Sequence, residues 1–205
     1  MWRSENFMKK YKKDFSNKDF ADYYIKRHKK IIKKLGYDYA KKLASLGFKR
    51  GKILDAGCGF GGMDIVLAKR IPGCEITGID LSDPLLEYAN SRVSNTNLEN
   101  RLKFKKCDVR NIPFKDNTFD VVFSINMVHS VNEPIIMLNE IERVLKPNGY
   151  LFIKDLRRSW FGILENEVKS AFTLNEAKKL IEQSKLKKGT FSKSILWWNF
   201  ELCQM

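Results

Sequence analysis

No long apolar run occurs in this sequence of 205 residues, and none approaches the roughly 20 residues that a membrane span requires. The first residues, MWRSENFMKKYKKDF, also lack the apolar centre of a signal peptide. The composition is 43% hydrophobic and 12% aromatic, which is enough apolar side chain to build one core. These features argue against an integral membrane protein and a disordered chain. We expect a folded protein in the cytoplasm.

Cysteine and histidine are both scarce. The cysteines are Cys58, Cys74, Cys107 and Cys203, and the histidines are His28 and His129. No two cysteines form a CxxC pair, and two histidines add little to such a dispersed set. We therefore expect no metal site and reduced thiols.

Acidic residues are few relative to basic ones, and the imbalance lies in one part of the chain. The formal net charge is +14, and residues 1–50 hold sixteen Lys and Arg against five Asp and Glu, which accounts for +11. Such a segment attracts nucleic acid, an anionic membrane surface or an acidic substrate. It also suits a solvated basic face in a chain rich in Lys, Asn and Ile, and we favour that interpretation.

Glycine, in contrast, is concentrated in one turn. The stretch 52–64 reads KILDAGCGFGGMD, in which a short apolar run precedes four glycines and helical spacing follows. The predicted elements are a strand, a tight turn and a helix. Glycine permits the sharp reversal and lets a ligand approach the backbone. We expect the amides of this turn to face a bound molecule.

Two kinds of ligand are compatible with this turn. Gly57, Gly59 and Gly62 satisfy the GxGxxG pattern of dinucleotide-binding proteins, and Asp80 lies where a ribose-binding acid is expected. Asp55 favours the second kind, because its carboxylate repels a pyrophosphate but attracts the ammonium and sulfonium of an adenosyl cofactor. We therefore prefer an adenosyl cofactor without phosphates to a dinucleotide.

Four further motifs follow in order along the chain. They are GIDLS around Asp80, KCDVRNIPF around Asp108, NTFDVVFSINMVHSV over 117–131 and RVLKPNGYLFIKD over 143–155. With the glycine turn, this series resembles class I S-adenosylmethionine (SAM)-dependent methyltransferases, in particular the methyltransferase type 11-like group that includes quinone-biosynthesis and other small-molecule enzymes. The resemblance covers residues 50–155. It implies SAM as cofactor and S-adenosylhomocysteine (SAH) as product.

Short apolar runs alternate with amphipathic stretches from residue 51 onward, which predicts βαβ units and a mostly parallel sheet. The predicted strands are 52–56, 75–80, 102–106, 119–125 and 150–155, and the predicted helices are 63–71, 84–93, 133–145, 156–172 and 174–184. The resemblance implies a Rossmann-like α/β fold with seven strands, in which residues 189–202 form an antiparallel C-terminal hairpin.

One methyltransferase domain, residues 1–205, is expected. Its parts are a helical, Lys-rich N-terminal cap (1–50), a SAM-binding core (51–155), and a substrate-side segment with the last two strands (156–205). The cap is expected to pack across the carboxyl ends of the strands. Within it, helical spacing stops at Gly36, and a further segment, 37–46, ends at Gly47, so we expect separate helices on either side of Gly36.

The resemblance assigns five residues to the methionine part of SAM. Asp55 reaches the ammonium through water, and Gly57 and Gly59 leave room for the sulfonium side of the cofactor. Ser124 and Asn126, at the end of the fourth predicted strand, lie beside the methionine part and the reacting methyl group.

Four more residues are assigned to the adenosine part. Asp80 accepts hydrogen bonds from both ribose hydroxyls, and Leu81 flanks the adenine ring. Asp108 accepts from the adenine amino group, while the Val109 amide is available to a ring nitrogen. Because Ser82 and Asp83 are better placed to cap the following helix, capping does not explain Asp80.

The predicted reaction is methyl transfer from SAM to a small organic acceptor. His129 is the candidate general base, for acceptors that lose a proton early, although a structural role for it is equally open. Arg157, Arg158, Trp160 and Phe161 either grip the acceptor or serve as surface and packing residues. Two alternatives stay open: an RNA or protein methyltransferase that uses the basic N-terminal segment, and a SAM-binding protein without turnover. Neither the acceptor nor the oligomeric state is predicted.

Overall fold

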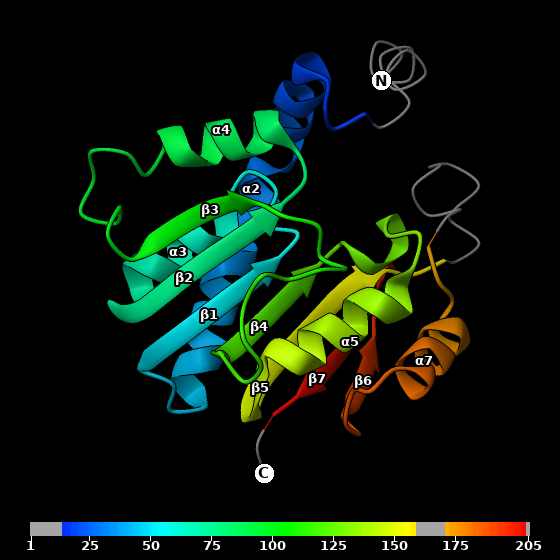
Figure 1. Cartoon of the computed structure of the whole chain (residues 1–205). Helices are drawn as coiled ribbons and strands as arrows, with labels where there is room; N and C mark the ends of the chain where they lie inside the picture. The colour runs from blue at the N-terminus through cyan, green and yellow to red at the C-terminus, as the bar shows by residue number, and fades with distance from the viewer. Residues whose placement is uncertain (1–13, 159–170, 204–205) are drawn as a thin grey trace.

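A seven-stranded sheet, in the order β3-β2-β1-β4-β5-β7-β6, runs through the computed structural model, which describes residues 14–158 and 171–203 (Figure 1). The strands are β1 (Arg50–Ala56), β2 (Gly73–Asp80), β3 (Leu102–Lys106), β4 (Phe119–Ile125), β5 (Leu145–Leu156), β6 (Thr190–Lys193) and β7 (Trp197–Leu202). Strands β1 to β5 are parallel, and β7 is antiparallel to both β5 and β6. The Rossmann-like sheet and its antiparallel C-terminal hairpin are confirmed.

Helices cover both faces of this sheet. One face carries α2 (Lys18–Ser45), α3 (Gly62–Arg70) and α4 (Asp83–Ser91), and the other carries α5 (Pro134–Val144) and α7 (Leu174–Gln183). The central strands are buried on both sides, since neighbouring residues such as Val121 and Val122 have no exposed surface. Near-continuous apolar runs are typical of parallel strands covered by helices.

Strand β5 begins earlier than predicted, at Leu145 instead of Tyr150. Leu145 pairs with Phe119 of β4, and the ladder resumes where Tyr150 pairs with Val121. The intervening Lys-Pro-Asn-Gly stretch therefore bulges out between two pairing positions of one strand. Its proline and glycine look like a simple stop signal in sequence, because pairing on both sides of the bulge depends on the neighbouring strand.

The predicted break at Gly36 is wrong, because α2 is one helix of 28 residues that passes through it. A Cβ at Gly36 would lie 2.8 Å from Val66 Cβ and 3.0 Å from Met63 O, both in α3. The glycine thus permits close packing of two helices instead of ending one. The predicted end at Gly47 is correct, since Gly47 has φ +75°, the conformation that commonly follows a helix.

The first turns of α2 cover part of the carboxyl edge of the sheet. Tyr24 packs against Phe60 of the glycine turn, with ring centroids 6.2 Å apart. Just before the helix, Phe15 O accepts a hydrogen bond of 2.6 Å from Ser82 Oγ, at the start of α4. The chain preceding α2 is therefore tied to the loop that follows β2.

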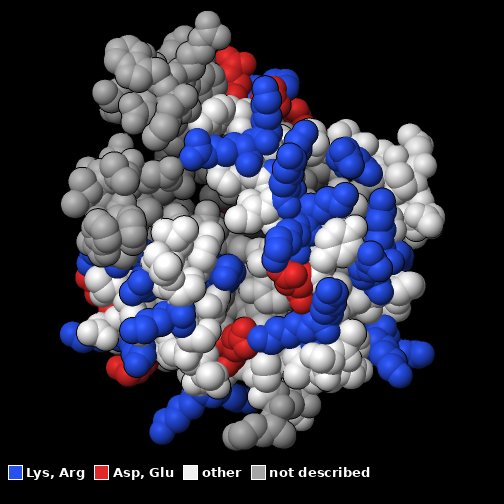
Figure 2. Space-filling model, turned by 180° about the vertical axis from the view of Figure 1, so that it is seen from behind, with Lys and Arg blue, Asp and Glu red and all other residues white. Residues whose placement is uncertain are grey.

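Figure 2 views the molecule from behind, the side on which α2 lies, and Lys and Arg outnumber Asp and Glu on this face. Exposed lysines of α2 include Lys26, Lys29, Lys30 and Lys33. Two others form ion pairs along the helix, Lys18 with Asp22 and Lys34 with Asp38. No helix in the described ranges has the length and apolarity needed to cross a bilayer.

Candidate functional site

The glycine turn between β1 and α3 lies at the carboxyl edge of the sheet. Gly57, Gly59 and Gly61 have φ values of +92°, +53° and +67°, which other residues rarely adopt. A Cβ at Gly57 would lie 2.7 Å from Met127 Sδ, whereas a Cβ at Gly59 would meet only Leu85 Cδ1, at 3.9 Å. The space above Gly59 is therefore open, and a ligand can approach the backbone there.

The expectation that the amides of this turn face a ligand is wrong for three of them. Gly57 N–H and Cys58 N–H both donate to Ile79 O, at 2.9 and 3.0 Å, and Gly59 N–H donates to Asp80 Oδ2 at 2.8 Å. The end of β2 uses these donors, because β1 and β2 are adjacent and their hydrogen bonding continues into the turn. A pyrophosphate would find these amides occupied, which further disfavours a dinucleotide.

Asp80 is held at the end of β2 by two backbone amides. Besides the bond from Gly59, its Oδ1 accepts from Ser82 N–H at 2.9 Å. Burial raises the pKa of Asp80, although the bonds from these amides oppose the shift. Each carboxylate oxygen retains a lone pair for a ribose hydroxyl. Ser82 is the N-cap of α4, through a bond from Leu85 N–H to its Oγ, as the sequence predicts.

Leu81 lies beside Asp80 with 52% of its surface exposed. An exposed leucine next to a half-buried carboxylate offers an apolar face adjoining a hydrogen-bonding group. This pairing suits a nucleoside, whose flat base follows directly on a polar ribose.

Asp108 is bound by a residue that the sequence did not single out, Arg110. Arg110 Nε donates to both carboxylate oxygens at 3.1 Å, its Nη2 donates to Oδ2 at 2.7 Å, and its backbone N–H donates to Oδ1 at 2.9 Å. These bonds lower the pKa of Asp108. They also occupy its acceptor capacity, so an adenine amino group has to share the carboxylate with Arg110. Val109, which follows Asp108, is buried.

Two polar residues at the end of β4 have unpartnered side-chain atoms. Ser124 is fully buried, and its Oγ has no hydrogen-bond partner among the described residues. Asn126 has φ +59°, donates its backbone N–H to Lys154 O at 2.7 Å, and leaves its Oδ1 without a described partner. Buried polar atoms are normally hydrogen-bonded, so each of these points to a ligand or an ordered water.

Two acidic side chains are buried beneath the glycine turn. Asp55 ends β1 with 3% exposure, and Asp64, in the first turn of α3, has none. Asp55 is a predicted site residue, whereas Asp64 is not. The only signal for Asp64 is an acid within an otherwise apolar helical stretch, MDIVLA, and such a residue is ambiguous without the tertiary structure.

His129 and Asp155 form a second buried polar pair at this edge. His129 lies in the short 3₁₀ helix η1 (Val128–Ser130) after β4, and Asp155 lies near the end of β5. His129 Nδ1 is 2.6 Å from Asp155 Oδ1, and His129 N–H donates to Asp155 Oδ2 at 3.3 Å. The side chains are 3% and 0% exposed. The sequence singled out His129 but not its partner.

The predicted acceptor-gripping residues receive no support as such. Arg157 Nη2 donates to Ile195 O at 3.0 Å, and Arg158 forms an ion pair with Glu176 of α7. Both arginines therefore have structural partners. Trp160 and Phe161 lie outside the described residues, as does most of the helix predicted over 156–172.

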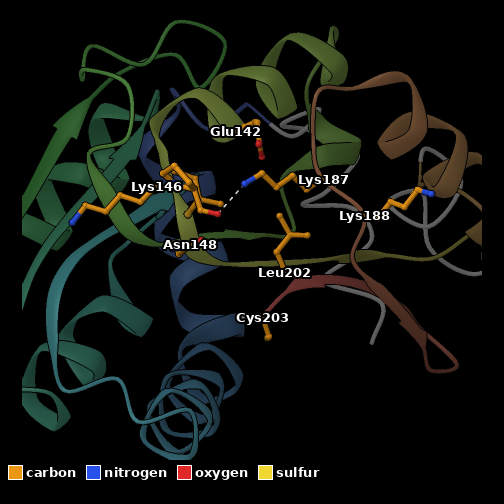
Figure 3. Close-up of a pocket in the computed structure, with 10 residues that line it drawn as sticks. Glu142, Lys146, Asn148, Lys187, Lys188, Leu202 and Cys203 are labelled. Atoms are coloured by element: carbon orange, nitrogen blue, oxygen red, sulfur yellow. Dashed lines mark hydrogen bonds between the residues drawn. The ribbon is translucent and has the colours of Figure 1, made fainter. Parts of the chain in front are cut away.

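Two cavities are found at the opposite, amino edge of the sheet. One, of about 370 Å³, is lined by residues that include Glu142, Lys187 and Leu202 (Figure 3). The other, of about 500 Å³, is lined by Arg50, Asp120 and neighbouring residues. Neither contains a predicted cofactor-binding residue. In the described ranges no cluster of three His, Cys, Asp or Glu side chains is arranged to hold a metal ion.

The residues at the carboxyl edge fit SAM. The buried Asp55 carboxylate suits its ammonium, and the half-buried Asp80 carboxylate suits its ribose hydroxyls. The open backbone at Gly59 admits a ligand, and the exposed Leu81 suits the adenine. The structure thus brings Asp55, Gly57, Gly59 and Asp80 together around one turn. Ser124 and Asn126 end the neighbouring strand β4, and Asp108 follows β3.

Comparisons with known proteins relate the chain to methyltransferases. A family described as "Methyltransferase domain" matches residues 54–153. The demethylmenaquinone methyltransferase of Lactobacillus johnsonii is 32% identical over 154 residues, which cover 67% of this chain and 63% of that protein. The chain spans between 30% and 63% of the length of the first curated relatives that it matches.

Solved structures extend the similarity. A SAM-dependent methyltransferase from Aquifex aeolicus is 25% identical, with a TM-score of 0.68 over 78% of this chain and 86% of that one. A protein of Methanococcus maripaludis, 21% identical, shares the fold with a TM-score of 0.75 over 94% of both chains. The fold, the glycine turn with its acids, and these relatives together show that the chain belongs to the class I SAM-dependent methyltransferases, whose cofactor is SAM.

Proposed function

We propose that this protein transfers a methyl group from SAM to a small organic acceptor that carries an acidic proton, such as a hydroquinone or a phenol. The buried pair of His129 and Asp155 is the observation that carries this proposal. The similarity to a demethylmenaquinone methyltransferase supports an acceptor of this type. SAM, when bound, supplies an electrophilic methyl group on a sulfonium leaving group.

His129 acts as the general base in this proposal. Asp155 is fully buried and accepts from both the Nδ1–H and the backbone N–H of His129, which sets the tautomer and leaves Nε2 as the basic nitrogen. As the acceptor oxygen, or a ring carbon conjugated to it, bonds to the methyl group and SAH leaves, the hydroxyl proton of the acceptor passes to Nε2. Asp155 is a positioning residue that also stabilises the imidazolium formed.

The remaining residues hold and orient the cofactor. Asp80 binds the ribose hydroxyls, and Gly59 lets the methionine chain pass close to the backbone. Ser124 and Asn126 supply unpartnered polar atoms beside the reacting methyl group. The α2 helix, through Tyr24 against Phe60, helps to exclude water from the turn. Because the reaction is a direct displacement, positioning of this kind supplies much of the rate enhancement.

The test is a methyl-transfer assay with SAM labelled on its methyl group and a panel of hydroquinones and phenols. His129→Gln and Asp155→Asn are compared with the wild type. We expect kcat to fall by about 10²- to 10⁴-fold in His129→Gln, while the dissociation constant of SAM stays within about twofold. Unchanged kcat in His129→Gln would refute the base, and SAM binding without turnover on any acceptor would favour the catalytically silent alternative.

A further inference from the structure

Asp55 and Asp64 are two buried carboxyl groups, and three of their four oxygens have no hydrogen-bond partner among the described residues. They are 3% and 0% exposed, and neither oxygen of Asp64, nor Oδ1 of Asp55, has a partner in the described part of the chain. Burial of a carboxylate without a donor or a counter-ion is costly. A fold that retains two of them side by side therefore needs something to neutralise them.

No cation of the described chain performs this task. The titratable groups that face the pair are Tyr39 from α2, Cys58 from the glycine turn and Asp80 from the end of β2. Burial raises the pKa of the Cys58 thiol, and Asp64, Asp80 and Asp55 raise it further. Burial also raises the pKa of Tyr39, with smaller contributions from Glu201 and Asp55. None of these groups carries a positive charge, so none of them offsets a double negative charge on the pair.

The carboxyl groups of Asp55 and Asp64 lie within hydrogen-bonding reach of each other. Two ionised carboxylates cannot form such a bond, because both are acceptors only. Burial and the neighbouring negative charge raise the pKa of Asp55, and burial raises that of Asp64. Without a ligand, burial and the closeness of the two carboxyl groups both favour a proton shared between them.

We propose that Asp64 is a second acidic residue of the seat for the SAM ammonium, and that this ammonium replaces a proton that Asp64 and Asp55 share in the free protein. An ammonium has three N–H donors. The pair offers three acceptor oxygens without a described partner, Asp55 Oδ1, Asp64 Oδ1 and Asp64 Oδ2. The carboxyl that loses its proton releases it to solvent, and the positive charge of the ligand takes its place.

This inference rests on the proposed placement of the methionine part of SAM at the ends of β1 and β4. It assigns Asp64 a role in cofactor binding that its position inside a helix does not suggest. It also predicts a coupling between cofactor binding and proton release, which a structural role for Asp64 would not produce.

The experiment is titration calorimetry at pH 7 in two buffers of different ionisation enthalpy, which counts the protons released. The ligands are SAM, SAH and 5′-methylthioadenosine, which keeps the nucleoside but lacks the ammonium. For the wild type, we expect proton release with SAM and SAH and none with methylthioadenosine. In Asp64→Asn, we expect the release to disappear and affinity for SAM and SAH to fall at least tenfold, with affinity for methylthioadenosine within twofold of the wild type.

Glu142→Gln is the matched control. Glu142 is a half-buried acid of α5 whose pKa is also raised by burial, but it lines the 370 Å³ cavity at the amino edge (Figure 3). Its variant should keep the affinity and the proton release of the wild type. Asp64→Ser replaces Asp64→Asn if melting curves show that the latter is unfolded.

Two outcomes overturn the inference: proton release and SAM affinity that survive the loss of the Asp64 carboxyl, or equal proton release with methylthioadenosine and SAM. Failure of the proposed cofactor site looks different, because the wild type would then bind neither SAM nor SAH.

Discussion

The acids at the two edges of the sheet differ in whether their carboxylate oxygens have hydrogen-bond partners. At the amino edge, Asp120 Oδ2 accepts from Lys52 N–H at 2.8 Å, and its Oδ1 pairs with Lys146 Nζ at 2.6 Å. At the carboxyl edge, Asp55 and Asp64 are buried with unpartnered oxygens. Asp120 therefore ties the start of β4 to β1 and β5.

The difference separates acids that stabilise the fold from acids that cost stability. Unsatisfied buried groups weaken the folded state, and they persist where a ligand completes them. Within the described ranges, five unpartnered oxygens, from Asp55, Asp64, Ser124 and Asn126, gather at the carboxyl edge and support the proposed binding site there, whereas Glu142 Oε2 and Arg101 Nη1 are unpartnered elsewhere.

The largest effect is expected when one acid at each edge is replaced by alanine and the two variants are compared. Asp80→Ala should weaken SAM binding by about 100-fold, because it removes hydrogen bonds from a charged acceptor to two ribose hydroxyls. Asp120→Ala should leave SAM affinity unchanged and lower the free energy of unfolding by about 1–2 kcal/mol. Calorimetry and urea denaturation of both variants measure this. Similar SAM affinity in the two variants would contradict the assignment of cofactor binding to the carboxyl edge alone.

Two glycines of the turn allow a comparison within the carboxyl edge, between a position needed for packing and a position that leaves space for the ligand. Gly61→Ala places a Cβ 2.3 Å from Phe104 Cζ, so we expect it to lower the free energy of unfolding by about 3 kcal/mol. Gly59→Ala meets open space, and its stability cost should be limited to about 1–2 kcal/mol of backbone strain. It should instead weaken SAM binding about tenfold, because the new methyl group occupies the ligand's approach. Full SAM affinity in Gly59→Ala would show that the open space is not used.

The buried acid pair predicts a pH dependence of opposite sign to that of a salt-bridged carboxylate. Burial raises the pKa of Asp64 from 3.8 to about 7, so between these values the folded state binds more protons than the unfolded state. Stability without ligand should therefore fall as pH rises from about 4 through 7. Asp64→Asn should remove part of this fall and unfold at pH 8 with a free energy about 2 kcal/mol higher. Urea denaturation at pH 5 and pH 8 checks this, and a less stable variant at pH 8 would contradict it.

The smallest effect is expected on the basic face of α2. Lys26, Lys29, Lys30 and Lys33 are exposed, and surface charges of this kind contribute little to stability. Their replacement by Gln should change the free energy of unfolding by less than about 0.5 kcal/mol and leave SAM affinity and small-molecule turnover unaltered. If turnover instead requires RNA and falls steeply with added salt, the acceptor is a nucleic acid and the proposed function is wrong.

Much of the fold was predictable from local pattern. The predicted bounds of β3 and β4 agree with the structure, because short apolar runs between polar turns specify buried strands. The glycine turn and the Ser82 cap are likewise local features. Gly36 and the bulge within β5 were not predictable, because their meaning depends on a helix or strand that is distant in sequence.

Sequence by itself determined the order of elements, the parallel sheet and the acids at strand ends, because hydrophobic periodicity and turn chemistry act over a few residues. Only the tertiary structure decided which polar atoms have partners. It placed Asp155 against His129, Arg110 around Asp108, and Asp64 against Asp55. Burial and pairing arise when separate elements pack together, so the chemistry of this edge is a property of the folded sheet.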